Sequence, residues 1–295
     1  MNTPRVTFSH RVEYAGLVAI RSIVERMSLD RGTAFVAAMA RPLAPALRAR
    51  AMRNLALALP DLPEDDRRRI IAGMVDHLAR TAIEYLHLAE LRDDPSRITV
   101  TGIEHLHAAR DAGRGAVLVT GHLGNWEAVR AACARLDQAP AIIYRKFNTL
   151  QVDGEAQRRM NVLGAPLFHK GRRGTLGMLR HIRKGGAAMI LCDQRFKGAP
   201  RIPFFGVPAR TALAPAEIAL EYGAALLPVR GIRRGRTSTF DVTIDPPLPL
   251  GTGETAALDT MAEVNRTLER WIRETPEQYF WLHNRWGKGA RRPVE

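Results

Sequence analysis

Cysteine is scarce in this 295-residue chain, which has only Cys133 and Cys192, at no paired spacing. Two isolated thiols exclude a disulfide framework and a cysteine zinc site, and they favour a reducing compartment. The sequence also lacks a His-Glu-x-x-His motif, a Gly-x-Ser-x-Gly elbow, a P-loop and a Gly-x-Gly-x-x-Gly turn. We therefore expect no metal, no nucleotide cofactor and no serine nucleophile.

Long hydrophobic runs are missing as well. A helix that spans a bilayer needs about 20 consecutive apolar residues. The longest candidate near the N-terminus, residues 14–20, lies between Glu13 and Arg21. No secretory signal with a small-residue cleavage site is present. The sequence therefore predicts a chain without a membrane-spanning helix.

Acidic residues are few relative to basic ones. The chain has 44 Lys and Arg against 30 Asp and Glu, a formal net charge of +14. Such an excess implies an acidic partner, such as nucleic acid, an anionic membrane, a phosphorylated substrate or an acidic carrier protein. A nucleic-acid partner is disfavoured, because no helix-turn-helix, RRM or zinc-finger pattern occurs and the aromatic residues are not interleaved with the basic tract that follows Ala156.

The first 91 residues have a helical pattern. Apolar spacing predicts helices over 10–27, 33–40, 45–59 and 64–91, with breaks near Pro42 and Pro60. Residues 1–60 contain nine arginines and three acids. These arginines either line a solvated helical face or flank apolar stripes on an anionic leaflet. We assign residues 1–91 to an N-terminal, membrane-apposed helical region and residues 92–295 to an α/β domain.

After Arg97, short β-branched runs alternate with helical patterns. Strands are predicted over 98–101, 116–120, 139–144, 165–168, 187–191, 225–229 and 239–244, and helices over 126–136, 174–184 and 213–222. This alternation is typical of βαβ units around a largely parallel sheet flanked by helices. Ligand sites in such sheets lie beyond the carboxyl ends of the strands. His122, the Tyr144-Arg145 pair and the Asp193-Gln194 pair follow strand ends, so we expect them to converge at one edge.

One turn combines an imidazole with a carboxylate. His122 and Glu127 lie where a predicted strand becomes a helix, Gly121 and Gly124 allow close backbone approach, and Trp126 supplies an aromatic wall. A histidine suits proton transfer near neutral pH, and a carboxylate can orient it. The alternative is a core histidine beside a solvated glutamate.

Two further clusters are candidates for binding. Arg172 and Arg173 form a Gly-Arg-Arg-Gly turn, where guanidinium groups can meet phosphate or carboxylate. Asp193 and Gln194 precede Arg195 at a strand end, and this segment is either a site or an ordinary polar turn. With no protein nucleophile available, a histidine base suits direct transfer of a group onto a substrate hydroxyl.

These residues resemble the late acyltransferases of lipid A biosynthesis, within the lysophospholipid acyltransferase superfamily. Residues 122–127 (His-Leu-Gly-Asn-Trp-Glu) match the family's His-x4-Asp/Glu box, and residues 143–148 look like its Tyr-Arg…Asn segment. Further matches in the same order are Asn54-Leu55, Asp193-Gln194, Phe204-Phe205-Gly206, Ala209…Thr211 and Trp281-Leu282-His283-Asn284-Arg285-Trp286. Together they cover nearly the whole chain.

The resemblance implies a glycerol-phosphate-acyltransferase-like fold and an O-acyltransferase. The donor would be an acyl-carrier-protein thioester, and the acceptor a phosphorylated glycolipid at the cytoplasmic face of the inner membrane. His122 would be the general base and Glu127 would orient it. Substrate contacts would come from Asn125, Tyr144, Arg145, Arg159, Arg173, Asp193 and Gln194, with Arg159 or Arg173 foremost for the oxyanion or a phosphate. A lysophospholipid or another glycolipid is the alternative acceptor.

Two departures from the family pattern concern the membrane and the acceptor. The usual N-terminal anchor is more hydrophobic than this one, which is interrupted by Arg11, Glu13 and Arg21. Attachment to an anionic inner-membrane surface is therefore expected to be peripheral or through an N-terminal anchor, with peripheral attachment favoured over a spanning helix. The segment after Arg145 reads Lys-Phe-Asn-Thr-Leu in place of the usual Asn-Pro pairing, so the acceptor stays open.

Overall fold

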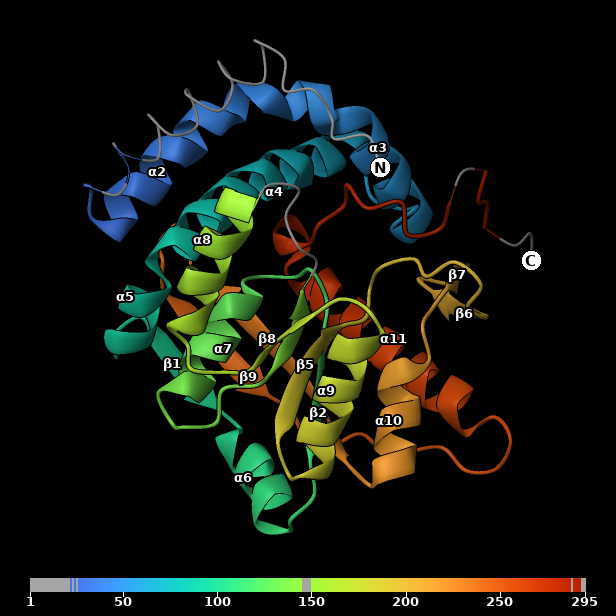
Figure 1. Cartoon of the computed structure of the whole chain (residues 1–295). Coiled ribbons are helices and arrows are strands. Elements are labelled where there is room, and N and C mark those ends of the chain that lie inside the picture. The colour runs from blue at the N-terminus through green and yellow to red at the C-terminus, as the bar shows by residue number, and fades with distance from the viewer. Residues whose placement is uncertain (1–21, 23, 25, 145–149, 288, 293–295) are drawn as a thin grey trace.

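The computed structural model describes residues 22, 24, 26–144, 150–287 and 289–292. Its first described helices are α2 (Leu29–Ala40), η1 (Arg41–Leu43), α3 (Ala44–Ala58) and α4 (Glu64–Glu84), followed by η2 (Tyr85–His87) and α5 (Leu88–Asp93). Figure 1 shows α2 and α3 as an arc over α4. The predicted break near Pro42 is a short 3-10 turn, because proline is tolerated in a first helical turn. The predicted helix over 10–27 falls mostly outside the described residues.

The central sheet has five strands in the order β1-β9-β8-β2-β5. Its strands are β1 (Ile98–Thr101), β2 (Ala116–Thr120), β5 (Ala187–Leu191), β8 (Ala225–Arg233) and β9 (Phe240–Ile244). Neighbours pair in parallel except β8 and β9. The parallel pair β3 (Ile142–Tyr144) and β4 (Leu167–His169) adjoins β5, because Ala141 bridges to Ala188. The largely parallel α/β sheet that the sequence predicts is confirmed.

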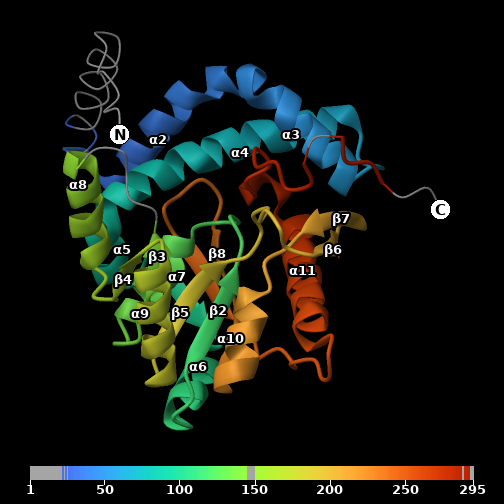
Figure 2. The same cartoon turned by 45° about the vertical axis from the view of Figure 1, so that its right-hand side comes forward.

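Helices cover both faces of this sheet, as Figure 2 shows. They are α6 (Ile103–Asp111), α7 (Trp126–Ala134), α8 (Leu150–Asn161), α9 (Arg172–Arg183), α10 (Ala214–Tyr222), α11 (Ala256–Glu274) and η3 (Pro276–Gln278). A hairpin of β6 (Arg201–Phe204) and β7 (Val207–Arg210) is present that was not among the predicted strands, and its turn places Phe205 and Gly206 at positive φ. Phe204 and Phe205 are buried edge to face, 5.0 Å apart, as a core aromatic pair.

The hydrophobic core is divided by the sheet into two clusters. Successive residues of β2 serve opposite clusters: Val117 and Val119 pack on one side, and Ala116 and Leu118 on the other. All five residues of β2 are buried, as expected for a central parallel strand. Among the described residues, no helix combines the length and apolar character needed to cross a bilayer. The domain boundary expected after residue 91 stays a prediction.

Candidate active site

His122 lies in the turn that joins β2 to α7. Gly124 adopts φ +58°, and a Cβ there would lie 2.1 Å from the carbonyl oxygen of Gly231 in β8, so only glycine fits. The backbone N–H of Asn125 donates to that same carbonyl at 2.8 Å. The carbonyl of His122 accepts from the backbone N–H of Phe280 at 2.9 Å. The turn is therefore held on two sides by backbone contacts.

Asp193 is the carboxylate that contacts His122. Its Oδ1 lies 2.7 Å from Nδ1 of the ring, and its Oδ2 accepts from the backbone N–H of His122 at 2.9 Å. Asp193 follows β5, which is the neighbour of β2 in the sheet, so the two residues come from adjacent carboxyl ends. A Cβ at position 121 would lie 3.3 Å from the carboxyl carbon of Asp193, so Gly121 permits this approach. The predicted convergence of His122 with Asp193 is confirmed.

The contact with Asp193 determines the tautomer of His122. Because the carboxylate accepts, Nδ1 carries the proton and Nε2 of the neutral ring keeps its lone pair. Nε2 lies 3.2 Å from the side-chain amide of Gln194, which can donate to it. The ring also packs against Trp126 at 5.2 Å and Phe280 at 6.1 Å, so the expected aromatic wall is present.

Electrostatics adjust both members of this pair. Burial disfavours the imidazolium form, but the charge and hydrogen bond of Asp193 outweigh it and raise the pKa of His122. Burial acts to raise the pKa of Asp193, yet the charge and hydrogen bonds of His122 keep it below the ordinary value. Asp193 is therefore an ionised carboxylate next to a histidine whose conjugate acid it stabilises.

The structure does not show the predicted contact between His122 and Glu127. Glu127 is buried in the first turn of α7, where its Oε2 lies 2.6 Å from Nη1 of Arg130, itself buried. The two residues are close along the chain, but α7 begins between them and directs Glu127 into the interior. Glu127 therefore helps to hold the helix in place, and the carboxylate that contacts the His122 ring is that of Asp193.

Asn125 caps the helix that follows the histidine. Its Oδ1 accepts from the backbone N–H groups of Glu127 and Ala128, as a helix N-cap does. Its Nδ2 donates to Oε2 of Glu84 at 2.8 Å. In the described structure Asn125 is thus a helix cap, and the substrate contact that the family resemblance implies for it stays a prediction.

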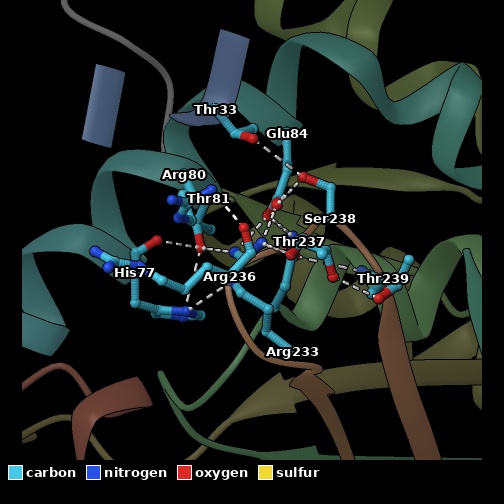
Figure 3. Close-up of polar contacts among 12 residues, drawn as sticks. Thr33, His77, Arg80, Thr81, Glu84, Arg233, Arg236, Thr237, Ser238 and Thr239 are labelled. Atoms are coloured by element: carbon cyan, nitrogen blue, oxygen red, sulfur yellow. Dashed lines mark hydrogen bonds and ion pairs between the residues drawn. The ribbon is translucent and has the colours of Figure 1, made fainter. Parts of the chain in front are cut away.

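Glu84 is the centre of a buried network between α4 and the β8–β9 hairpin, shown in Figure 3. It forms a two-pronged ion pair with Arg233 and accepts from Ser238 Oγ at 2.8 Å. On the same helix, His77 accepts at Nδ1 from Arg233, so its Nε2 donates to the carbonyl of Gly124 at 3.1 Å. Burial, followed by the charge of Arg233, lowers the pKa of His77 to about 3, so the ring is neutral. The N-terminal helices therefore position the active-site turn.

The candidate arginines have different positions. Arg173 lies exposed in the first turn of α9, and among the described residues no contact joins it to His122. Arg159 donates from Nη1 to the carbonyl of Leu86 at 2.8 Å. Arg145 lies outside the described residues. Tyr144 is half-buried, with its hydroxyl 3.5 Å from Nε2 of His169. Their roles toward substrate stay predictions.

Residues near the C-terminus complete the site. Arg285 is buried, and its Nη1 donates to the carbonyl of Arg210 at 2.6 Å and to that of Gln194 at 3.4 Å. The buried Tyr279 lies beside Asp193, and burial, followed by that charge, raises the pKa of its phenol. The sequence motif over 281–286 was noticed without a role for Arg285, because its contacts lie more than 70 positions away.

The described residues contain no group of three or more His, Cys, Asp or Glu side chains placed to hold a metal ion. What they do contain is a histidine whose Nε2 lone pair faces the side-chain amide of Gln194 and whose Nδ1 contacts the carboxylate of Asp193. Such a pair can take a proton from a hydroxyl group and stabilise the resulting imidazolium.

Several known proteins are similar in sequence to this chain over most of its length. The chain is 29% identical over 270 residues to a lipid A biosynthesis palmitoleoyltransferase of Escherichia coli, covering 88% of this chain and 84% of that protein. It is 27% identical over 248 residues to a lipid A biosynthesis lauroyltransferase of the same organism (79% and 76%). It is also 30% identical over 200 residues to a phosphatidylinositol mannoside acyltransferase of Mycobacterium tuberculosis, covering 63% and 59%. The sequence profile of bacterial lipid A biosynthesis acyltransferases matches residues 6–288, and this chain therefore belongs to that family of O-acyltransferases.

Proposed function

We propose that this protein transfers a fatty acyl chain from an acyl-carrier-protein thioester to a hydroxyl group of a lipid A precursor, with His122 as general base and Asp193 as its orienting partner. The observation that carries this proposal is the 2.7 Å contact between Nδ1 of His122 and Asp193, which leaves Nε2 to accept a proton. A base placed in this way typically contributes about 10²- to 10⁴-fold to a rate.

The reaction needs no covalent intermediate on the protein. Nε2 of His122 takes the proton of the acceptor hydroxyl as its oxygen attacks the thioester carbonyl. The tetrahedral intermediate then collapses, the C–S bond breaks, and the imidazolium returns the proton to the departing thiolate. The products are an ester and the carrier protein's thiol, so protons and electrons balance. Asp193 stabilises the imidazolium between the two proton transfers.

The oxyanion of the tetrahedral intermediate requires a donor. Gln194 is one candidate, because its side-chain amide already lies at Nε2 of His122 and can turn toward the reacting carbonyl. Arg159, Arg173 and Arg145 remain the cationic candidates from the sequence. Either arrangement would place positive potential where negative charge develops.

A basic surface beside the histidine supports an acidic carrier protein as donor. The loop after Gln194 continues with Arg195, Phe196 and Lys197, all exposed, and the Phe196 side chain is 59% accessible. Across the sheet edge, the exposed Arg172 and Arg173 begin α9. Cations around an exposed apolar anchor suit an acidic partner that presents a covalently attached acyl chain.

A phosphorylated glycolipid is the proposed acceptor, at the cytoplasmic face of the inner membrane. Family membership and the two E. coli relatives favour a lipid A precursor. The similarity to a phosphatidylinositol mannoside acyltransferase favours a second candidate, an inositol- or mannose-containing glycolipid. Both acceptors are glycolipids that carry a hydroxyl group and a phosphate, so the same base can serve either one.

The decisive experiment is an in vitro assay of the purified full-length protein with several acyl-carrier-protein donors and two acceptors, a tetra-acylated lipid A precursor and a phosphatidylinositol mannoside. We expect ester formation on the lipid A precursor, seen as a mass increase of one acyl chain. His122→Ala should abolish it, and His105→Ala, on α6, serves as the control. Transfer only to the mannoside would select the second candidate, and turnover by His122→Ala at the wild-type rate would refute the mechanism.

A further inference from the structure

The outer face of α2, η1 and α3 exposes an unusual concentration of large apolar side chains. Eight such side chains are exposed among the described residues, and four of them are Phe35 (43%), Met39 (50%), Leu43 (57%) and Leu47 (37%). They recur every four residues, so they follow one side of the helical arc. We call these four residues the apolar ridge. The opposite side of the arc is already buried, with Ala37 and Leu55 in contact with the core.

The surface around the ridge contains few polar groups. Between Gly32 and Leu47 the only ionisable residue is Arg41, and the single hydroxyl residue, Thr33, is buried. The remaining exposed positions among the large side chains are alanine and proline. A soluble surface helix needs one apolar stripe, toward the core, whereas this arc has two.

Arginines border the ridge, and two of them, Arg41 and Arg48, form ion pairs with Asp76 and Glu64 of α4. From residue 26 to residue 59 the chain has six arginines and one acid, Asp30. Asp30 is paired with Arg97 at 3.1 Å, so it does not offset the arginines. Arg26, Arg31 and Arg53 are exposed, and within the described part of the chain none of the three has an acidic partner. An apolar stripe with a cationic border matches the boundary between acyl chains and anionic headgroups.

The ridge lies on the side of the molecule toward which the catalytic strand ends point. Figures 1 and 2 show α4 between the sheet and the arc of α2 and α3. α4 contacts the active-site turn directly, since His77 donates to the carbonyl of Gly124. A bilayer that meets the ridge would therefore face the same end of the fold as His122.

We propose that the apolar ridge is a membrane-docking surface, which inserts Phe35, Met39, Leu43 and Leu47 into an anionic phospholipid leaflet while the bordering arginines contact headgroup phosphates. The inference deepens the proposed function and rests on its membrane-borne acceptor. Vesicle binding has no catalytic readout, so the docking surface and the transferase activity can fail separately.

The test uses the full-length protein and vesicles of phosphatidylethanolamine with phosphatidylglycerol. The ridge variant Met39→Glu/Leu43→Glu is compared with Leu136→Glu/Leu220→Glu, whose original side chains are 41% and 37% exposed on other elements. Both variants change the net charge equally. We expect the ridge variant to bind vesicles about 100-fold more weakly and the control to bind within about threefold of wild type. Wild-type binding should also weaken with added salt and on neutral phosphatidylcholine vesicles.

A site-specific label provides a second measurement that does not depend on the fold tolerating two glutamates. Cys133 and Cys192 are both buried, so a cysteine introduced at Leu43 or at Leu136 can be labelled selectively with an environment-sensitive dye. On addition of vesicles we expect a blue shift, and quenching by brominated acyl chains, at position 43 and not at position 136.

Three outcomes would overturn the proposal. One is a ridge variant that sediments with vesicles like the control. The second is a label at position 43 whose spectrum does not respond to lipid. The third is a wild-type protein that forms a dimer, together with a ridge variant that is monomeric but still binds vesicles. That result would show that a second copy of the chain, and not the membrane, covers the apolar ridge.

Discussion

Replacing Asp193 by asparagine tests the catalytic pair most sharply. In the wild-type structure both carboxylate oxygens accept a hydrogen bond from His122, at 2.7 Å from Nδ1 and at 2.9 Å from the backbone nitrogen. Asparagine has one carbonyl oxygen, which accepts, and one NH₂ group, which donates. In one of the two contacts the NH₂ group would therefore face an N–H group of His122, and two donors cannot form a hydrogen bond. If the NH₂ group faces the ring, Nδ1 becomes an acceptor and the proton moves to Nε2. The lone pair that the reaction needs is then lost.

The expected cost of Asp193→Asn is about 10³- to 10⁴-fold in kcat. The same exchange in a serine protease triad also disfavours the working tautomer and lowers kcat about 10⁴-fold. The pH profile gives an independent readout. Loss of the Asp193 charge leaves burial as the main influence on His122, so the pKa of His122 falls. Because the base acts in its neutral form, the rising limb of the residual kcat/KM should move to lower pH.

Thiol release from the acyl carrier protein, followed over a pH series, measures both effects. Glu127→Gln is the matched control, a carboxylate-to-amide exchange at the residue that the sequence analysis had chosen. It should leave the rising limb at the wild-type pH, because Glu127 contacts Arg130. The reasoning is refuted if Asp193→Asn keeps more than about a tenth of the activity, or if Glu127→Gln moves the limb and Asp193→Asn does not.

The same pair makes stability depend on pH. The pKa of His122 is higher in the folded protein than in the unfolded chain, where it is about 6.5. The resulting stabilisation is complete at pH values below the unfolded-state pKa and is lost as pH rises through the folded-state pKa. The pKa of Asp193 is lower in the folded protein than in the unfolded chain, where it is about 3.9. The resulting stabilisation is complete at pH values above the unfolded-state pKa and is lost as pH falls through the folded-state pKa. Urea denaturation should therefore show the largest difference between wild type and Asp193→Asn near pH 5 to 6, and smaller differences at about pH 3 and pH 9.

Three further predictions follow from the turn and its supports. His122→Ala should lower kcat about 10²- to 10⁴-fold while the protein keeps its folded secondary structure, as measured by turnover and circular dichroism. Glu84→Gln leaves the buried guanidinium of Arg233 without its counter-charge, so it should lower the free energy of unfolding by about 3–5 kcal/mol. Urea titrations measure this change, and a decrease below about 1 kcal/mol would contradict a stabilising role of the network. Gly124→Ala should cost at least about 2 kcal/mol, because of its positive φ and the clash with a backbone carbonyl, whereas Gly113→Ala, also at positive φ but with open space around it, should cost less.

The layout of the sheet could be read from local patterns. Predicted strands over 98–101, 116–120 and 187–191 coincide with β1, β2 and β5, because a buried parallel strand is a short apolar run bounded by turn residues. The hairpin of β6 and β7 escaped prediction, since its strands contain Pro203 and Pro208 and proline weakens a strand pattern.

The chemistry of the site was partly predictable. His122 stands in a recognisable strand-to-helix turn, so the proposed base could be found from neighbouring residues alone. Its partner could not, because proximity along the chain favoured Glu127 over a residue 71 positions away. A helix that begins at Trp126 rotates successive side chains by about 100°, and this rotation directs Glu127 into the interior.

The sequence by itself therefore determined the fold class, the position of the proposed base and the family. Only the tertiary structure decided which carboxylate contacts the histidine, that Asn125 caps α7 against Glu84, and that the four side chains of the apolar ridge are exposed. The physical reason is common to all three: each depends on which strand ends and helix faces meet in space. These contacts are determined by packing between segments that lie tens to hundreds of residues apart along the chain.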